Sequence, residues 1–367
     1  MNTAPRIGRL LNLAAVVALS APVAADGSGG VTNGTIAYAL KSLYWSVYQT
    51  PNARDECPDG LNTWGPRETF KALFPQEQGQ KWTIVESHLA REIEGWFPGE
   101  KPEKFPYREA GGKVAIGLNL DGTAGPNDFT SPTGEQGIDN EFFRVIGCQP
   151  NLRLPDGQMA FFNNKYIIDK HYNRTLIELT GVDDLINDPD VTVTMYRGLD
   201  PLLRDATGSG IIPGGSQRID VKFGGRFHHV TKGRIENGVL STVPADMTFP
   251  WTYVNGTPTV VVVRDMRFRL DLSGTGAEGL WAGYVDVDKF YDHMMMAEST
   301  HHQAYGQMSP PGFARSLFSH ADGHPDPATG KMTTISAALS TTFVQVVIVH
   351  PPETTDSKGG QSQLHVQ

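Results

Sequence analysis

The sequence lacks the short motifs by which common catalytic sites are identified. It has no GxSxG turn around a nucleophilic serine, no Walker phosphate-binding loop and no CxxCH haem attachment site. Each of these motifs supplies one piece of chemistry: an exposed nucleophile, a cradle for phosphate or a covalent anchor for haem. Their absence argues against α/β-hydrolases, P-loop nucleotide enzymes and c-type cytochromes, so whether the protein is an enzyme stays open.

Cysteine is also scarce, because Cys57 and Cys148 are the only two in 367 residues. A lone pair of cysteines in an exported protein usually forms a disulfide. The acidic residues that flank Cys57 would raise the pKa of its thiol and make it a poor nucleophile. The sequence therefore predicts a Cys57–Cys148 disulfide that closes a loop of roughly 90 residues and contributes about 4 kcal/mol to stability.

Export itself is predicted from residues 1–25. Arg6 and Arg9 form a basic start, an apolar run follows over 10–21, and Val23, Ala24 and Ala25 form a small-residue cleavage site. This layout is that of a secretory signal peptide, and the apolar run is shorter than the ~20 residues that span a membrane. We expect the mature protein to be exported, either to a periplasm or out of the cell.

Long apolar runs and runs of basic residues are both missing from the rest of the chain. We therefore expect no transmembrane segment in the mature protein. The net charge is −9, and removal of Arg6 and Arg9 with the signal peptide takes it to −11. An acidic chain without a basic patch argues against nucleic acid or an anionic membrane as a partner.

Glycine and proline are abundant, with 40 and 25 residues that follow no period. Inside a helix, glycine is unfavourable by about 1 kcal/mol and proline by about 3 kcal/mol. Short stretches with β-type patterns are bounded by turn residues and predict strands. These stretches are 113–120, 175–180, 191–196, 218–223, 259–272, 280–287 and 341–349. Without regular strand–helix alternation, they favour a mainly β fold, an antiparallel β-sandwich or jelly-roll-like domain with a few decorating helices.

Helical spacing of apolar residues appears before these strands. It predicts helices at 35–48, 66–74 and 81–97, the first with Ile36, Leu40 and Leu43 on one face. We expect four parts in the chain. They are the signal peptide 1–25, a helical and loop segment 26–110 packed on the main domain, the sandwich-like domain 111–352, and a polar, disordered tail 353–367.

The segment 119–142 concentrates oxygen-bearing side chains between glycine turns. Its candidate metal ligands are Asn119, Asp121, Asp128, Asp139 and Asn140. Calcium takes six to eight oxygen ligands, which such loops can supply. The spacing is not that of an EF-hand, so a calcium site here would be irregular. The alternative is a set of turns followed by a short helix with Asp139 as its N-cap.

A second acidic turn, 320–330, carries the candidate catalytic residues His320, Asp322, His324 and Asp326. A carboxylate beside an imidazole can orient it as a general base. Loops also use Asp-Gly and Asp-Pro pairs simply to turn the chain, so this alternative stays open.

Histidine and methionine cluster just before that turn, at His293, Met294–Met296, His301 and His302. Imidazole and thioether ligands suit copper, although methionine is also an ordinary core residue. Copper is therefore a weaker expectation than calcium.

Three functions follow as hypotheses. The first is an exported, non-catalytic binding or envelope-associated protein stabilised by calcium. The second is a secreted hydrolase or lyase that acts on a polysaccharide or an ester with the loop carboxylates, and the third is a copper-handling protein. The ligand is unknown. Trp45, Trp64, Trp251 and Trp281 would suit a carbohydrate if they were exposed, but large aromatic residues more often fill a core.

Overall fold

The computed structural model describes residues 30–62, 107–154, 173–252, 258–292 and 310–352, together with Gly157, Phe161, Asn164, Lys165 and Ile167. Several predictions lie outside these residues: the signal peptide, the helices at 66–74 and 81–97, the copper-ligand candidates and the tail. Within the part of the chain that is described, no helix is long and apolar enough to cross a membrane.

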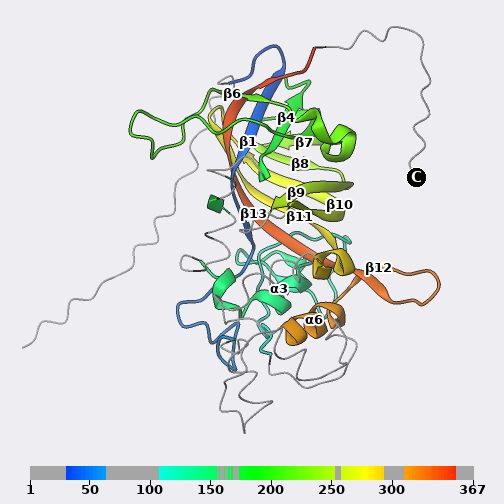
Figure 1. Cartoon of the computed structure of the whole chain (residues 1–367). Helices are drawn as coiled ribbons and strands as arrows, with labels where there is room; N and C mark the ends of the chain where they lie inside the picture. Colours follow the sequence, from blue (N-terminus) through cyan, green and yellow to red (C-terminus); the bar gives the residue numbers. More distant parts are fainter. Residues whose placement is uncertain are drawn as a thin grey trace, which may run out of the picture.

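An antiparallel sheet that closes on itself forms the body of the molecule (Figure 1). Among the described residues, eight strands form the closed ring. In ring order they are β1 (Thr35–Trp45), β4 (Thr175–Thr180), β5 (Asp188–Arg197), β7 (His229–Glu236), β8 (Val239–Thr242), β10 (Pro258–Leu272), β11 (Gly276–Asp286) and β13 (Met332–Val349). β13 closes the barrel because it is 18 residues long and pairs with β11 on one side and β1 on the other.

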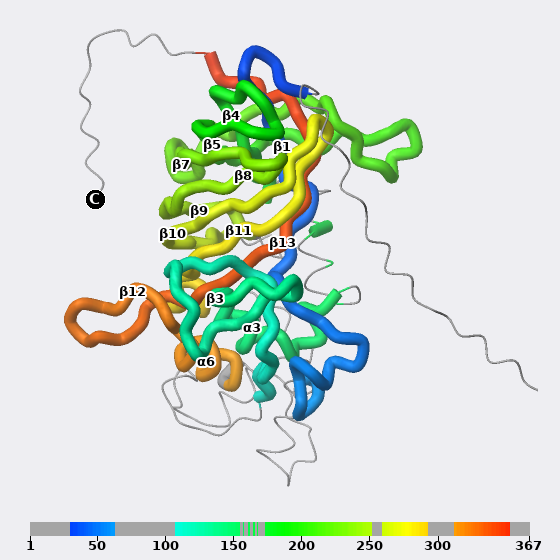
Figure 2. The backbone as a smooth tube through the Cα atoms, turned by 180° about the vertical axis from the view of Figure 1, so that it is seen from behind, coloured from blue at the N-terminus to red at the C-terminus, as the bar shows by residue number. Residues whose placement is uncertain are grey.

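Shorter elements decorate this barrel. They are β2 (Phe129–Thr130), β3 (Gln136–Ile138), α3 (Glu141–Ile146), η3 (Pro150–Leu152), β6 (Gly215–Arg218), η5 (Val221–Phe227), β9 (Ala245–Thr252), α6 (Pro310–Ser319) and β12 (Gly323–Pro325). β9 pairs with β10, β6 and β12 pair with opposite ends of β13, and β2 pairs with β3 in a separate small sheet. α3, α6 and β3 gather at one end of the barrel (Figure 2).

The prediction of a mainly β, antiparallel fold is confirmed, but a sandwich or jelly roll is the wrong arrangement. A sandwich needs two sheets packed face to face, whereas here the first strand pairs with the last and one sheet closes. That pairing runs from Ala37 opposite Val346 to Trp45 opposite Leu339. Strand patterns in a sequence indicate buried faces and do not specify which strands pair.

The helix predicted at 35–48 is also wrong, because these residues form β1. Ile36, Tyr38 and Leu40 lie in the large core, whereas Ala37 and Ala39 lie in a smaller core outside the barrel wall. From Ile36 to Leu40 both faces of the strand are buried, so this stretch is continuously apolar. In such a run the period that separates a helix from a strand disappears.

Two of the seven predicted strands are largely absent. Residues 113–120 make only isolated bridges, at Val114 and Leu118. The pattern at 218–223 is interrupted because β6 ends at Arg218 and a 3-10 turn begins at Val221, with the Asp220 carboxylate accepting a hydrogen bond from the Lys222 N–H. The other five coincide with, or lie largely within, β4, β5, β10, β11 and β13.

The predicted disulfide is present between Cys57 and Cys148, whose Cα atoms are 5.8 Å apart. It joins the segment after β1 to the segment after α3. Beside it, the buried Arg153 guanidinium pairs with the Glu56 carboxylate and donates to the Gly147 carbonyl. This buried ion pair and the disulfide hold the segments around Cys57 and Cys148 together.

Candidate functional site

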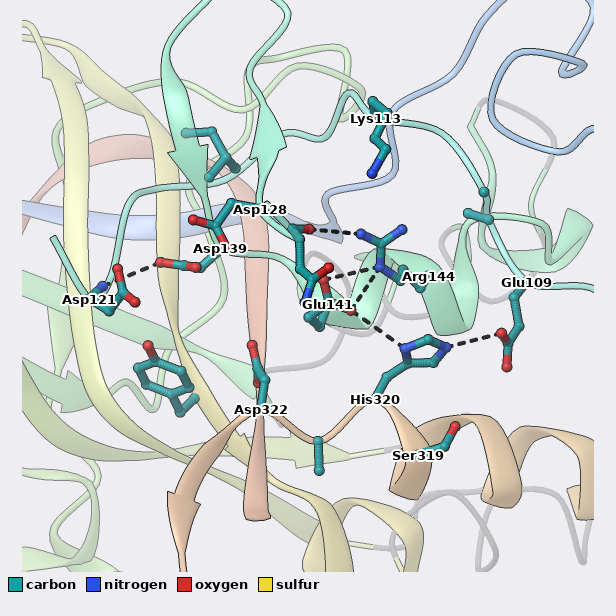
Figure 3. A pocket seen from close by; sticks show the side chains of 16 residues that line it. Glu109, Lys113, Asp121, Asp128, Asp139, Glu141, Arg144, Ser319, His320 and Asp322 are labelled. Atoms are coloured by element: carbon teal, nitrogen blue, oxygen red, sulfur yellow. Dashed lines mark hydrogen bonds and ion pairs between the residues drawn. The ribbon is translucent and has the colours of Figure 1, made fainter. Parts of the chain in front are cut away.

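A pocket of about 750 Å³ lies outside the barrel wall, where the loop 107–139 and the N-terminus of α3 meet β11 and the end of α6 (Figure 3). Its lining contains six carboxyl groups and three basic side chains. The carboxyl groups belong to Glu109, Asp121, Asp128, Asp139, Glu141 and Asp322, and the basic groups to Lys113, Arg144 and His320. Tyr284 adds a phenol from β11.

The loop reaches this position because it is attached to the outer face of the barrel. Leu118 and Leu120 pack against Ala282 and Ala338, which point outward from β11 and β13. The Arg267 guanidinium on β10 also donates a hydrogen bond of 3.1 Å to the Asn119 carbonyl. Apolar contact and this bond therefore place the acidic turn beside the barrel wall.

His320 joins two of the carboxylates. Its Nε2 lies 3.0 Å from Glu109 Oε2, and its Nδ1 lies 3.5 Å from Glu141 Oε2. The bonds to Glu109 and Glu141 raise the pKa of His320 to about 9, so it is an imidazolium at neutral pH. Arg144 also pairs with Glu141, through an Nε to Oε2 contact of 2.8 Å. Glu109 and Glu141 are thus charge-compensated within the protein.

Asp322 differs from those two glutamates. Its Oδ1 accepts a hydrogen bond of 2.7 Å from the Ser336 N–H, while the residue stays open to solvent on the pocket side. Enclosure by protein on its other sides raises its pKa to about 6. The Ser336 bonds partly oppose this rise, and the charges of Glu141 and Asp139 add to it. A carboxyl group of this kind exchanges its proton close to neutral pH.

Asp139 faces the same space from the loop (Figure 3). Its Oδ2 accepts hydrogen bonds from the backbone N–H groups of Leu120, at 2.6 Å, and Asp121, at 3.3 Å. Partial burial raises the pKa of Asp139 despite these bonds, and the charges of Asp121 and Asp128 add to the rise. Among the described ion pairs, none includes Asp139 or Asp322.

Asn140, not Asp139, is the N-cap of α3. Its side-chain oxygen accepts from the Phe143 N–H at 3.2 Å, and its amide donates to the Ile116 carbonyl at 2.8 Å. The predicted cap, Asp139, is wrong by one position, because aspartate and asparagine both cap helices well. Because Asn140 caps the helix, the Asp139 carboxylate instead bonds to the loop backbone and faces the pocket.

The other predicted metal ligands hold their own turns together. Asn119 bonds to the backbone of Gly122 and Thr123, and Asp121 accepts from the Thr123 N–H and hydroxyl. Asp128 accepts from the Gly125 N–H. In the described part of the chain, no group of three or more His, Cys, Asp or Glu side chains is arranged to hold a metal ion. Calcium at this segment remains a prediction.

The structure separates the four predicted catalytic residues. His320 and Asp322 line the pocket. His324 lies next to it, bonded to Asp265 and Thr334. Asp326 is exposed and caps the β12–β13 turn by accepting from the Ala328 and Thr329 N–H groups. A catalytic role for these residues is likewise still a prediction.

Several pocket residues carried no usable signal in the sequence. Glu109 and Tyr284 come from segments far from both acidic turns, and only the folded chain brings them there. Glu141 and Arg144 show helical i, i+3 spacing, which indicates an ion pair but not a pocket. The tryptophans considered for sugar binding do not contribute, because Trp45, Trp251 and Trp281 are buried in the core and Trp64 lies outside the described residues.

The pocket offers many hydrogen-bond acceptors and an excess of negative charge. Such a surface suits a ligand that carries positive charge and hydrogen-bond donors. Comparison of the chain with protein-family models, with curated proteins and with solved structures finds no match.

Proposed function

We propose that this protein is an exported binding protein whose pocket takes a small organic cation, an ammonium compound. One observation carries the proposal: the pocket has six carboxyl groups against three basic side chains, and Asp139 and Asp322 have no basic partner among the described residues. Neighbouring carboxylates repel one another and raise each other's pKa. A ligand ammonium group between them would relieve this repulsion.

An organic cation fits the site better than a bare metal ion does. The described carboxylates are not grouped closely enough for metal ligation, and several are already bonded to backbone N–H groups. An ammonium group needs only two or three acceptors, which can be further apart than the ligands of a cation such as calcium. Export is supported by the signal-peptide pattern and by the disulfide.

Calorimetric titration of the mature protein at pH 7.5 tests this function. We expect cyclohexylammonium to bind and cyclohexanol, its neutral counterpart, not to bind. Asp322→Asn should weaken binding about ten-fold, equivalent to ~1.4 kcal/mol, because a charge-assisted hydrogen bond is lost. Since the pKa of Asp322 is about 6, affinity should fall as the pH drops through that value and the carboxylate is neutralised.

The matched control is Asp190→Asn, which removes an exposed carboxylate that pairs with Lys232 on the barrel wall. This variant should bind cyclohexylammonium as the wild type does. Equal binding of the amine and the alcohol, or no binding of the amine at any pH, would contradict the proposal.

A hydrolase or lyase that acts on a polysaccharide or an ester is the second candidate function. It is favoured because the acidic segments 119–142 and 320–330, which are far apart in the sequence, contribute Asp139 and Asp322 to one pocket. A carboxyl group with a pKa of about 6 can donate or accept a proton near neutral pH. The wild type should then release product from an oligosaccharide or ester panel, and Asp322→Asn should not. A panel left intact by the wild type would remove this candidate.

A further inference from the structure

Two residues next to the pocket adopt the left-handed backbone conformation, which glycine adopts most readily. Asp265 has φ 50° and His324 has φ 51°, and their side chains bond to each other, with His324 Nε2 3.1 Å from Asp265 Oδ2. Because a carboxylate only accepts hydrogen bonds, Nε2 carries the proton. Nδ1 of the same ring lies 2.9 Å from Thr334 Oγ1, so both nitrogens of the imidazole are engaged. Left-handed backbone at such residues is typical of positions that the rest of the structure holds in place.

The pair connects strands that are not neighbours. Asp265 lies on β10 and His324 on β12, and β11 and β13 lie between them in the sheet. Asp265 sits in a bulge, where the pairing of β10 with β11 shifts between Arg264 and Arg267. Bulges redirect a side chain away from the regular alternation of a strand. Because of the bulge, the Asp265 side chain reaches the His324 ring across β11 and β13.

Tyr284 of β11 lies against this bridge. Its ring contacts the His324 ring edge to face, with centroids 5.2 Å apart and planes at 81°. It also lies so close to Gly323 that a Cβ atom there would be 2.5 Å from Tyr284 Cδ1. Gly323 therefore provides room for the phenol ring, and His324 contacts that ring from the next position along β12.

The hydroxyl group of Tyr284 is available to a ligand. Among the described residues it has no hydrogen-bond partner, although the side chain lines the pocket beside Asp121, Asp139 and Asp322. Partial burial, with the charges of these three carboxyl groups, raises the pKa of Tyr284 well above its usual range, so the O–H proton is retained. The phenol is a neutral donor beside three carboxyl groups that accept hydrogen bonds.

We infer that Tyr284 selects ammonium ligands that also carry hydroxyl or ether oxygens, a class that includes amino sugars, and that Asp265 and His324 position it for this role. The carboxylates accept from the ammonium group, and the Tyr284 hydroxyl donates to a ligand oxygen. A ligand without that oxygen leaves the phenol donor unpaired in the bound state. This inference rests on the proposed function and specifies the ligand class of the same pocket.

Glucosamine and cyclohexylamine, titrated at pH 7 into wild type and Tyr284→Phe, form the test. We expect the wild type to bind glucosamine about ten-fold tighter than cyclohexylamine. Tyr284→Phe should abolish that preference and leave cyclohexylamine affinity within about two-fold of wild type, because only the hydroxyl is removed.

The positioning role is tested with His324→Gly and Asp265→Gly, since glycine adopts positive φ without strain and each change removes one side chain of the bridge. Both variants should still unfold in a single cooperative transition, which shows that they are folded, and should lose the preference for glucosamine. A retained preference in both variants would overturn the positioning role. A Tyr284→Phe variant that prefers glucosamine as the wild type does, or that loses both ligands equally, would overturn the selection by Tyr284 while the proposed function stands. A wild type that binds neither amine would overturn both.

Discussion

Replacement of Cys57 and Cys148 together by alanine is expected to lower the free energy of unfolding by about 4 kcal/mol. The two residues are 91 positions apart, so without the disulfide the unfolded chain gains the entropy of a long open loop. Alanine suits both positions because each cysteine is fully buried. The measurement is urea unfolding of the mature protein with an intact disulfide and of the double variant.

A reducing agent provides the matched control for this change. It should destabilise the wild type by a similar amount and leave the double variant unaffected. Loss of the disulfide should also alter the pocket. Gly111 donates a hydrogen bond to the Glu56 carbonyl beside the disulfide, and Glu109, which lines the pocket, is two positions earlier in the same loop. Unfolding midpoints that do not differ between wild type and variant would contradict the stabilising role.

His320→Gln is expected to reduce stability by about 1 to 2 kcal/mol at pH 6 and by much less at pH 10. His320 has a folded pKa of about 9, above the usual 6.5, because the imidazolium bonds to Glu109 and Glu141. A raised pKa means that the stabilisation is complete below about pH 6.5 and is lost as the pH rises through 9. The magnitude is reduced from the full value of the shift because the ring is partly exposed and screened by solvent.

Unfolding free energies of both proteins between pH 5.5 and pH 10 provide the measurement. The wild type should lose its advantage over His320→Gln across the interval from about 6.5 to 9. Glutamine has no charge in this range, so it serves as the reference for a neutral side chain that can still form hydrogen bonds. A difference between the two proteins that stays constant over the whole range would show that the contribution of His320 is packing rather than charge.

Individual strands were readable from the sequence where one face of the strand is more polar than the other. The run at 259–272 coincides with β10 for this reason, because its buried positions alternate with more exposed ones from Val261 to Leu272. The runs at 175–180 and 280–287 coincide with β4 and most of β11, although β4 is buried on both faces. β1 was mistaken for a helix because both of its faces are buried. Closure of the sheet was not readable at all, since it depends on pairing between Ser42 and Thr342, which are 300 positions apart.

The candidate site, like the fold, could be predicted from the sequence only in part. The acidic segments 119–142 and 320–330 stand out in composition, and their members Asp139 and Asp322 do share a pocket. Nothing in either segment indicates that His320 forms ion pairs with both Glu109 and Glu141. Residue type alone does not separate Asp139 from Asn140 as the helix cap. In the folded chain Asn140 is the cap, because the Asp139 carboxylate bonds to the Leu120 N–H of the loop.

The sequence by itself determined the β-rich character of the chain, the disulfide and the two acidic turns, because local pattern, cysteine count and composition are properties of short segments. Only the tertiary structure decided that the sheet closes through β1 and β13, that the pocket forms on the outer wall, and that Tyr284 lies against the bridge from Asp265 to His324. These features depend on contacts between residues far apart in the chain. Such contacts close long loops and depend on residues at both ends of each loop, so no local stretch of sequence specifies them.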